Sequence, residues 1–191
     1  VTRRQSKCWS KIKNISNYFV ISMYMTSVPI RYVPTTLSPG DKKRQAKYLK
    51  QSRRAYKNAR GDGRYQTRKR VKSFVSKESP HIVKARQMYK VPNIKPSRQL
   101  AKATKCSLKG LKRMVSKGKG AYYSSGSRPN QTAHSWGYAR MASAITGGKA
   151  SAVDYHIIEK ECSKTSKVAR LARKARKTYK NGRKRVKQVK I

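Results

Sequence analysis

Positive charge is distributed unevenly along the chain, and this limits where a packed core can form. Of 191 residues, 50 are Lys or Arg and 6 are Asp or Glu, so the formal net charge is +44. Residues 120–162 contain four basic and three acidic residues, whereas residues 41–119 contain 27 and three, and residues 163–191 contain 13 and none. Because like charges repel one another in a compact state, we expect the core in the near-neutral window 120–162.

The excess of positive charge also indicates what the chain interacts with. Folding does not need a charge of +44, so we expect an acidic partner: nucleic acid, an anionic membrane or an acidic protein surface. Paired-carboxylate hydrolases and two-metal nucleases need clustered acids, and the six acids here are scattered. Ser124, Ser125, His134 and Asp154 are residue types of a hydrolase triad, but no nucleophile elbow accompanies them. We therefore predict a protein that is not an enzyme, without catalytic residues or cofactors.

The cysteines and histidines do not follow a metal-binding pattern. Cys8, Cys106 and Cys162 are far apart, no CxxC motif is present, and the three histidines are equally scattered. We therefore predict no metal site. The isolated cysteines are interpreted as free thiols in a reducing compartment, or as one chance cross-link.

The first residues differ from the rest of the chain. An uncharged run, residues 14–30, lies between Lys13 and Arg31 and is at the short limit for a membrane span. It also resembles a signal peptide, but no small-residue cleavage site follows. Three interpretations of residues 1–24 stay open: upstream translation before an initiator at Met25, a segment that touches a membrane, or a structured arm.

Residues 25–78 are predicted to form a basic arm. Ser38 as N-cap and Pro39 at the first helical position predict a helix to about Asn58. Its apolar stripe is narrow, which favours a solvated basic helix that becomes ordered only on a polyanion. A basic segment with a short strand around residues 71–75 follows. Ser79 and Pro80 then repeat the start signal for a short helix over residues 81–90.

Residues 97–117 have the pattern of a helical pair. Ser97 and Ser107 are placed as N-caps, and the spacing of Leu, Ala and Val is similar to a helix-turn-helix. Lys109, Lys112 and Arg113 would then lie on the exposed side of the second helix. Three roles stay open for this helix: reading a DNA major groove, contacting the phosphate backbone, or packing only. It carries no Asn or Gln, the residues that read adenine.

The near-neutral window begins with a glycine- and serine-rich stretch that is typical of a loop. A phosphate-binding loop is the alternative to a tight loop anchored by tyrosines, but the P-loop spacing is absent. Thr132 is a plausible N-cap for a helix that ends at Gly147, and Ser151 with Asp154 resembles a capping box for a helix to about Cys162. The predicted core residues are Tyr122, Tyr123, Trp136, Tyr138, Met141, Ile145 and Ile157.

These patterns together predict a mainly α fold. We expect a small helical domain at residues 79–162, formed by the helix-turn-helix-like pair and two further helices. A basic arm, residues 25–78, precedes it, and a basic C-terminal tail, residues 163–191, follows it. The tail has a narrow helical stripe and ends in a basic run that resembles a nuclear signal.

The candidate polyanion-binding residues come from the helical pair, the glycine-rich stretch and the tail. They are Lys109, Lys112, Arg113, Lys117, Lys119, Arg128, Arg173, Lys174, Arg183, Lys184 and Arg185. Because Lys and Arg without Asn or Gln suit phosphates, we expect binding that depends on salt more than on sequence.

One block of the sequence supports a resemblance to a family. The pattern GxGAxxSSGxRPxQT, followed by WxYAR, spans residues 118–140. With the segments on either side it resembles an uncharacterised family of small basic proteins encoded by large eukaryotic DNA viruses, with more distant relatives in tailed phages. The resemblance covers roughly residues 30–160. It implies a viral origin and a place in the virion, but no enzyme activity and no known site.

We therefore expect a non-enzymatic basic virion protein, either a minor capsid component or an internal one. Its expected partners are other virion proteins of the capsid lattice, viral DNA, or both, with membrane contact through residues 14–30. It would be made in the host cytoplasm or nucleus and act in the virion by neutralising and tethering acidic partners. The alternatives are a helix-turn-helix-like DNA-binding regulator and a ribosomal-type RNA-binding protein.

Overall fold

The computed structural model describes residues 27–59, 65–182 and 186–191. Helices dominate these residues, which confirms the predicted mainly α fold. Residues 1–24 and the basic residues Arg183, Lys184 and Arg185 lie outside the described residues. The elements in chain order are β1 (Ser27–Pro29), η1 (Ile30–Tyr32), α2 (Pro39–Asn58), α3 (Pro80–Tyr89), α4 (Arg98–Thr104), α5 (Leu108–Ser124), α6 (Ala133–Ile145), α7 (Lys149–Val153), α8 (Tyr155–Glu161), α9 (Lys167–Thr178), η2 (Lys180–Gly182) and β2 (Gln188–Lys190).

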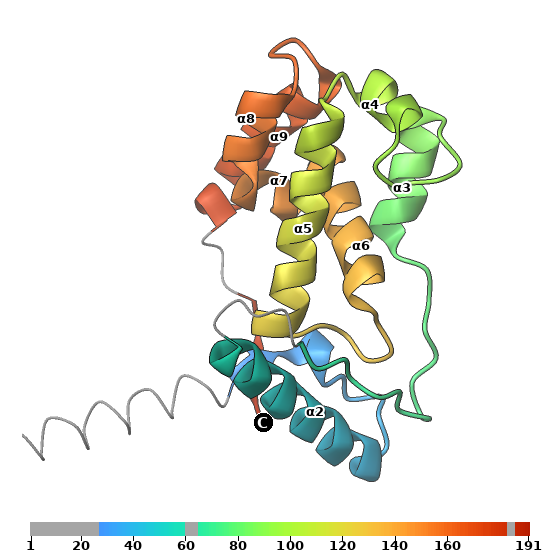
Figure 1. The fold of residues 1–191 in the computed structure, drawn as a ribbon, viewed down its shortest axis with the longest axis vertical. Helices are drawn as coiled ribbons and strands as arrows, with labels where there is room; N and C mark the ends of the chain where they lie inside the picture. Colours follow the sequence, from blue (N-terminus) through green and yellow to red (C-terminus); the bar gives the residue numbers. More distant parts are fainter. Residues whose placement is uncertain (1–26, 60–64, 183–185) are drawn as a thin grey trace, which may run out of the picture.

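Helices α5 and α6 form the centre of the molecule. Helix α5 runs along the long axis, with α3 and α4 on one side and α7, α8 and α9 on the other (Figure 1). Gly118 of α5 and Gly137 of α6 meet: a Cβ at Gly118 would lie 2.6 Å from the Gly137 Cα. The two backbones therefore approach more closely than any larger residue would allow.

The main core lies among these helices and extends beyond the near-neutral window. Fully buried side chains come from α3, α4, α5, α6, α8 and α9. Among the predicted core residues, Tyr122, Met141, Ile145 and Ile157 are buried, whereas Tyr123 and Tyr138 are half-buried. The larger buried side chains of this core are Leu100, Leu111, Met114, Met141, Ile145, Ile157, Ile158 and Val168.

A second, smaller cluster packs at the C-terminal end of α5. Leu49 of α2 is fully buried there with Val28, Tyr32 and Val71. The expectation of a solvated helix that orders only on a polyanion is therefore wrong for α2, because one face of this helix is packed. The cluster is closed by antiparallel pairing of β1 with β2, in which Val28 lies opposite Val189.

Trp136 also belongs to this second cluster. We expected it in the main core, but it is half-buried and its ring meets Tyr32 edge-on at 5.7 Å between centroids. Trp136 lies on α6 close to the N-terminus of that helix, and the main core is formed by later residues such as Met141. Its packing therefore links α6 to the segment that precedes α2.

Helix α9 corrects the predicted boundary after Cys162. Val168 and Ala172 are fully buried, and α9 packs against α7 and α8 in the main core. The interpretation of residues 163–191 as a separate tail gave more weight to their charge than to the narrow apolar stripe of the helix. The boundary at residue 162 is therefore wrong.

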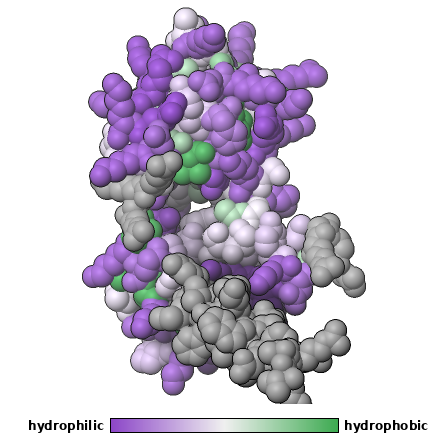
Figure 2. Space-filling model, turned by 90° about the vertical axis from the view of Figure 1, so that its left-hand side faces the viewer, coloured by the Kyte–Doolittle hydropathy of each residue, from purple (hydrophilic) through white to green (hydrophobic). Residues whose placement is uncertain are grey.

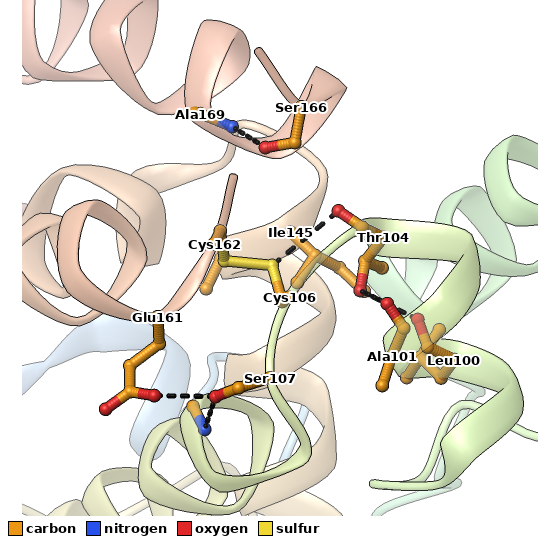
Figure 3. The surroundings of a disulfide bond; sticks show 12 residues. Leu100, Ala101, Thr104, Cys106, Ser107, Ile145, Glu161, Cys162, Ser166 and Ala169 are labelled. Atoms are coloured by element: carbon orange, nitrogen blue, oxygen red, sulfur yellow. Dashed lines mark hydrogen bonds between the residues drawn. A yellow bond between two sulfur atoms is a disulfide. The ribbon is translucent and has the colours of Figure 1, made fainter. Parts of the chain in front are cut away.

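A disulfide joins Cys106 to Cys162 and lies beside this helix (Figure 3). It connects the α4–α5 turn to the start of the α8–α9 connection. Two backbone hydrogen bonds flank it: the Ser107 N–H donates to Glu161 O, and the Ser163 N–H donates to Lys105 O. The free-thiol interpretation is therefore wrong for these two cysteines, and the alternative of one cross-link applies to them.

Two local predictions in the near-neutral window were also wrong. The stretch that resembled a loop after Gly118 continues α5 to Ser124, and Gly118 itself lies against Gly137 of α6. Helix α7 begins before Ser151, so Ser151 and Asp154 do not form a capping box. The Ser151 hydroxyl instead donates to the Ala144 carbonyl oxygen.

The predicted N-caps agree with the structure at most helix starts. Ser38, Ser97 and Ser107 each accept a backbone N–H in the first turn of the following helix. Thr132 does so for α6, in a reciprocal capping box with Ser135. Ser79 precedes α3 without a side-chain capping bond. Within the residues described, none of the helices is both long and apolar enough to cross a membrane.

Candidate polyanion-binding surface

Most of the acidic residues that the structure describes form ion pairs with cations of the same molecule. Glu161 pairs with Arg113 at 3.0 Å, Glu78 pairs with Arg86, and Asp41 pairs with Arg44. Hydrogen bonds keep these acids charged: the Ser107 hydroxyl and then Arg113 lower the pKa of Glu161. These acids are therefore engaged within the molecule, and most cations face solvent.

Asp154 is the most deeply buried acid. Its side chain is fully enclosed and accepts two hydrogen bonds from the Arg140 guanidinium, each at 2.8 Å. Lys117 Nζ lies 3.1 Å from the same carboxylate. Lys117 was predicted to bind a polyanion, but its ammonium group forms an ion pair with Asp154. This ion pair joins α5 to the α7–α8 junction.

Helix α9 carries a regular row of exposed cations, which we name the α9 stripe. Its members follow one another at intervals of three and four residues, so they share one face of the helix. The opposite face carries Val168, Ala172 and Ala175 and is buried. Within the described part of the chain, none of the four side chains forms an ion pair. The α9 stripe consists of Lys167, Arg170, Lys174 and Lys177.

Two further arginines of α9 are held in place by neighbours. Arg173 donates to the Lys164 carbonyl oxygen, and the Arg176 guanidinium lies 4.3 Å from the centre of the Tyr155 ring. Arg176 also donates to the Asn181 side chain. On the side of the molecule that carries α8 and α9, hydrophilic side chains cover most of the described upper surface (Figure 2). The exposed Arg173 and Arg176 add two cations to α9 beyond the stripe itself.

The cations predicted on the second helix of the pair also lie together. Lys109, Lys112 and Arg113 line a shallow depression on α5, with Leu108 and Ser116. All three cations are exposed, and Arg113 is also paired with Glu161. Because the disulfide holds the start of α5 beside the α8–α9 connection, this depression and the α9 stripe belong to the same end of the molecule (Figure 1).

A second row of cations, which we name the α2 stripe, lies at the other end of the molecule. Its five members are spaced by three and four residues along α2, opposite the buried Gln45, Leu49 and Ser52. All five are exposed, and none forms an ion pair within the residues that the structure describes. The α2 stripe consists of Lys43, Lys47, Lys50, Arg54 and Lys57.

The segment after α2 adds cations on a fixed backbone. The Arg68 guanidinium lies 3.6 Å from the Tyr122 ring centre and donates to Ser52, Ser127 and the Tyr122 carbonyl oxygen. Burial lowers the pKa of Arg68. Arg68 therefore anchors this segment to α5 and to the buried side of α2 that carries Ser52, and Lys69 and Arg70 beside it are exposed.

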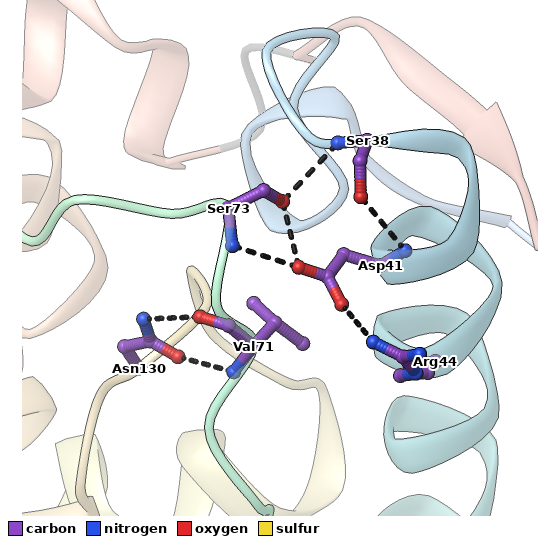
Figure 4. Close-up of polar contacts among 6 residues, drawn as sticks. All are labelled: Ser38, Asp41, Arg44, Val71, Ser73 and Asn130. Carbon is purple, nitrogen blue, oxygen red and sulfur yellow. Dashed lines mark hydrogen bonds and ion pairs between the residues drawn. The ribbon is translucent and has the colours of Figure 1, made fainter.

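Asn130 and Asp41 anchor the same segment further along (Figure 4). The Asn130 side chain accepts the Val71 N–H at 2.8 Å and donates to the Val71 carbonyl oxygen at 3.0 Å. Asp41 accepts the N–H and the hydroxyl of Ser73, and these bonds lower the pKa of Asp41. The strand expected around residues 71–75 is absent from this described segment. Its backbone groups form hydrogen bonds with the side chains of Asn130 and Asp41 instead of with another strand.

The remaining predicted residues are dispersed. Lys119 Nζ lies 3.4 Å from a His134 ring nitrogen. Arg128 follows α5, at the opposite end of that helix from Lys109. Partial burial lowers the pKa of His81, and the cations of Lys84, Arg128 and Arg31 lower it further, so Arg128 belongs to a different basic region. Arg173 and Lys174 both lie on α9, where Lys174 belongs to the α9 stripe and Arg173 is beside it.

The sequence-based prediction of binding residues missed most members of the α9 and α2 stripes. Of the α9 stripe it named only Lys174, and of the α2 stripe it named none. The signal was present in the sequence, because basic residues recur at intervals of three and four in both helices. Within the described residues, no three His, Cys, Asp or Glu side chains gather as metal ligands do.

Comparison with known proteins places the chain in a family. Residues 29–164 match the model of a family of unknown function (DUF5824). The chain belongs to this family. The DUF5824 match includes α2 and its stripe and ends before α9, so the α9 stripe lies beyond the matched residues. No curated protein and no solved structure matches the chain.

Proposed function

We propose that this protein is a non-catalytic virion component that binds the phosphate backbone of duplex DNA through the α9 stripe. The observation that carries this proposal is a row of four exposed cations on a helix whose other face is fixed in the core. A row of fixed cations neutralises phosphates and releases the counterions condensed on DNA. The folded scaffold holds the cations in place before binding.

The location in the virion rests on the resemblance of the block at residues 118–140 to proteins of large DNA viruses. Membership of DUF5824 is compatible with it but gives no function. Quantitative proteomics of purified particles, with and without their DNA, tests this part. The protein should be enriched in particles and be lost with the DNA. Retention on DNA-free shells would favour an acidic capsid face as the partner.

A sequence-reading regulator is less well supported by the second helix of the pair. The exposed face of α5 presents Lys109 and Lys112, and Arg113 is bound to Glu161. All of α5 is described, and it carries no Asn or Gln to contact adenine. We therefore expect contacts to phosphates and little sequence preference.

Neutralising the α9 stripe should weaken DNA binding. A variant with Gln at Lys167, Arg170, Lys174 and Lys177 is expected to bind a random-sequence duplex at least about tenfold less tightly at moderate salt, since up to four phosphate contacts are lost. Fluorescence anisotropy titration measures the affinity. The matched control exchanges Lys and Arg at the same four positions and should keep nearly full affinity.

The same titration separates the alternatives. Equal affinities of the Gln variant and the wild type would contradict a role for the α9 stripe. A selected sequence that the wild type binds about a thousandfold better than random DNA would support the regulator instead.

A further inference from the structure

Two separate basic surfaces on one molecule point to a second activity. The α9 stripe and the α2 stripe lie on helices at opposite ends of the long axis (Figure 1). Each is formed by cations at helical spacing, and each lies opposite a buried face. Binding of one DNA segment through the α9 stripe would leave the α2 stripe unused.

Helix α5 sets the separation of the two surfaces. The start of α5 is joined to the beginning of the α8–α9 connection by the disulfide between Cys106 and Cys162. Near its end, Tyr122 contacts Arg68, which in turn donates to Ser52 of α2. Helix α5 has 17 residues. At about 1.5 Å per residue this corresponds to roughly 25 Å, slightly more than the width of a DNA duplex.

The α2 stripe points away from the rest of the molecule. On the opposite face of α2, Gln45 donates to the Tyr32 carbonyl oxygen, and Leu49 lies against Gly126, so that face is turned toward the body. Gly126 follows directly after α5. The cations of the stripe are therefore directed outward beyond the C-terminal end of α5, whereas α9 lies along the flank at the other end (Figure 1).

We propose that the protein bridges two duplex DNA segments, with the α9 stripe on one phosphate backbone and the α2 stripe on the other. This inference rests on the proposed function, because it assigns a second DNA segment to a second surface. The charge of the α2 stripe indicates what binds to it. Its five exposed cations form no ion pair among the described residues, and they fit a polyanion whose charges recur along a line, as in DNA. Bridging of this kind would compact DNA in a confined volume.

Two exposed cations beside Arg68 lie on the segment that packs against the buried side of α2, apart from the α2 stripe. Lys69 and Arg70 are exposed on a backbone that Arg68 and Asn130 hold to the body. A fixed backbone loses little conformational entropy when its side chains meet a phosphate. The α2 stripe itself is fixed by the packed face of α2, as the α9 stripe is fixed by the buried face of α9.

A capture experiment with the full chain tests bridging. One random-sequence duplex is immobilised on beads, the protein is added below saturation, and capture of a second, labelled duplex is measured. The wild type should capture the labelled duplex. A variant with Gln at the five positions of the α2 stripe should still be retained by the immobilised duplex, but its capture of the second duplex should fall at least about tenfold.

The control exchanges Lys and Arg at the five positions and should capture as the wild type does. Circular dichroism verifies that the Gln variant is folded, which is expected because Gln is a good helix former and the five side chains are exposed. Undiminished capture by the folded Gln variant would overturn bridging through α2. A dimer that binds each duplex through one of its two α9 stripes would give this result. If the wild type is retained by the immobilised duplex but captures no labelled duplex, bridging alone is overturned. If the wild type is not retained at all, the proposed function is overturned as well.

Discussion

Replacing Ala172 with Asp is expected to unfold most of the protein, whereas the same replacement at the adjacent Arg173 should leave it folded. Ala172 is fully buried in the main core, and Arg173 is exposed on the same helix. A carboxylate at position 172 would be buried among apolar side chains, at an expected cost of about 4 kcal/mol or more. Typical domains have only about 5–15 kcal/mol of stability.

Urea denaturation followed by circular dichroism measures both variants. The Arg173 variant is the matched control, because it has the same new residue one position away and loses only a bond to the Lys164 carbonyl oxygen. Equally small losses of stability in both variants would contradict the placement of α9 in the core. The predicted domain boundary after residue 162 would then be correct, with residues 163–191 as a separate tail.

Removing the disulfide is expected to have the second largest effect on stability. Cys106 and Cys162 are separated by 56 positions, and closing a loop of this length restricts the unfolded chain by about 4 kcal/mol in the loop-entropy estimate. A variant with Ala at both positions should therefore lose several kcal/mol. It should keep the same helices, because the Ser107 and Ser163 N–H groups still hold the two turns together.

A reducing agent provides the control for this prediction. It should lower the free energy of unfolding of the wild type to that of the double variant and leave the variant itself unchanged. Mass spectrometry of an unreduced digest should show the peptides of Cys106 and Cys162 joined. Separate peptides with free thiols at both positions would show that the bond does not form in the native protein.

Local signals in the sequence predicted helix starts well. Ser38, Ser107 and Thr132 each cap a helix at the position where the sequence predicted an N-cap. A cap and its first turn are neighbours in the sequence, so their interaction is determined locally. The exposure of Lys109 and Lys112 on one side of α5 followed from the same reasoning, since helical spacing determines which side chains share a face.

Features that depend on contacts between distant residues were not predicted. The apolar face of α9 is formed largely by alanines, whose small area gave a weak signal beside the many cations. Gly118 suggested a loop, but its role is the close contact with Gly137 on another helix. The disulfide joins residues 56 positions apart, and spacing alone does not determine which cysteines pair.

The salt dependence of DNA binding tests the central claim most directly. Log affinity for a random duplex should fall linearly with log salt, and each neutralised phosphate contributes about 0.9 to the slope. Gln at Lys167, Arg170, Lys174 and Lys177 should therefore make the slope shallower by about 3 to 4, whereas exchange of Lys and Arg at these positions should leave it unchanged. The same slope for the wild type and the Gln variant would contradict phosphate binding by the α9 stripe.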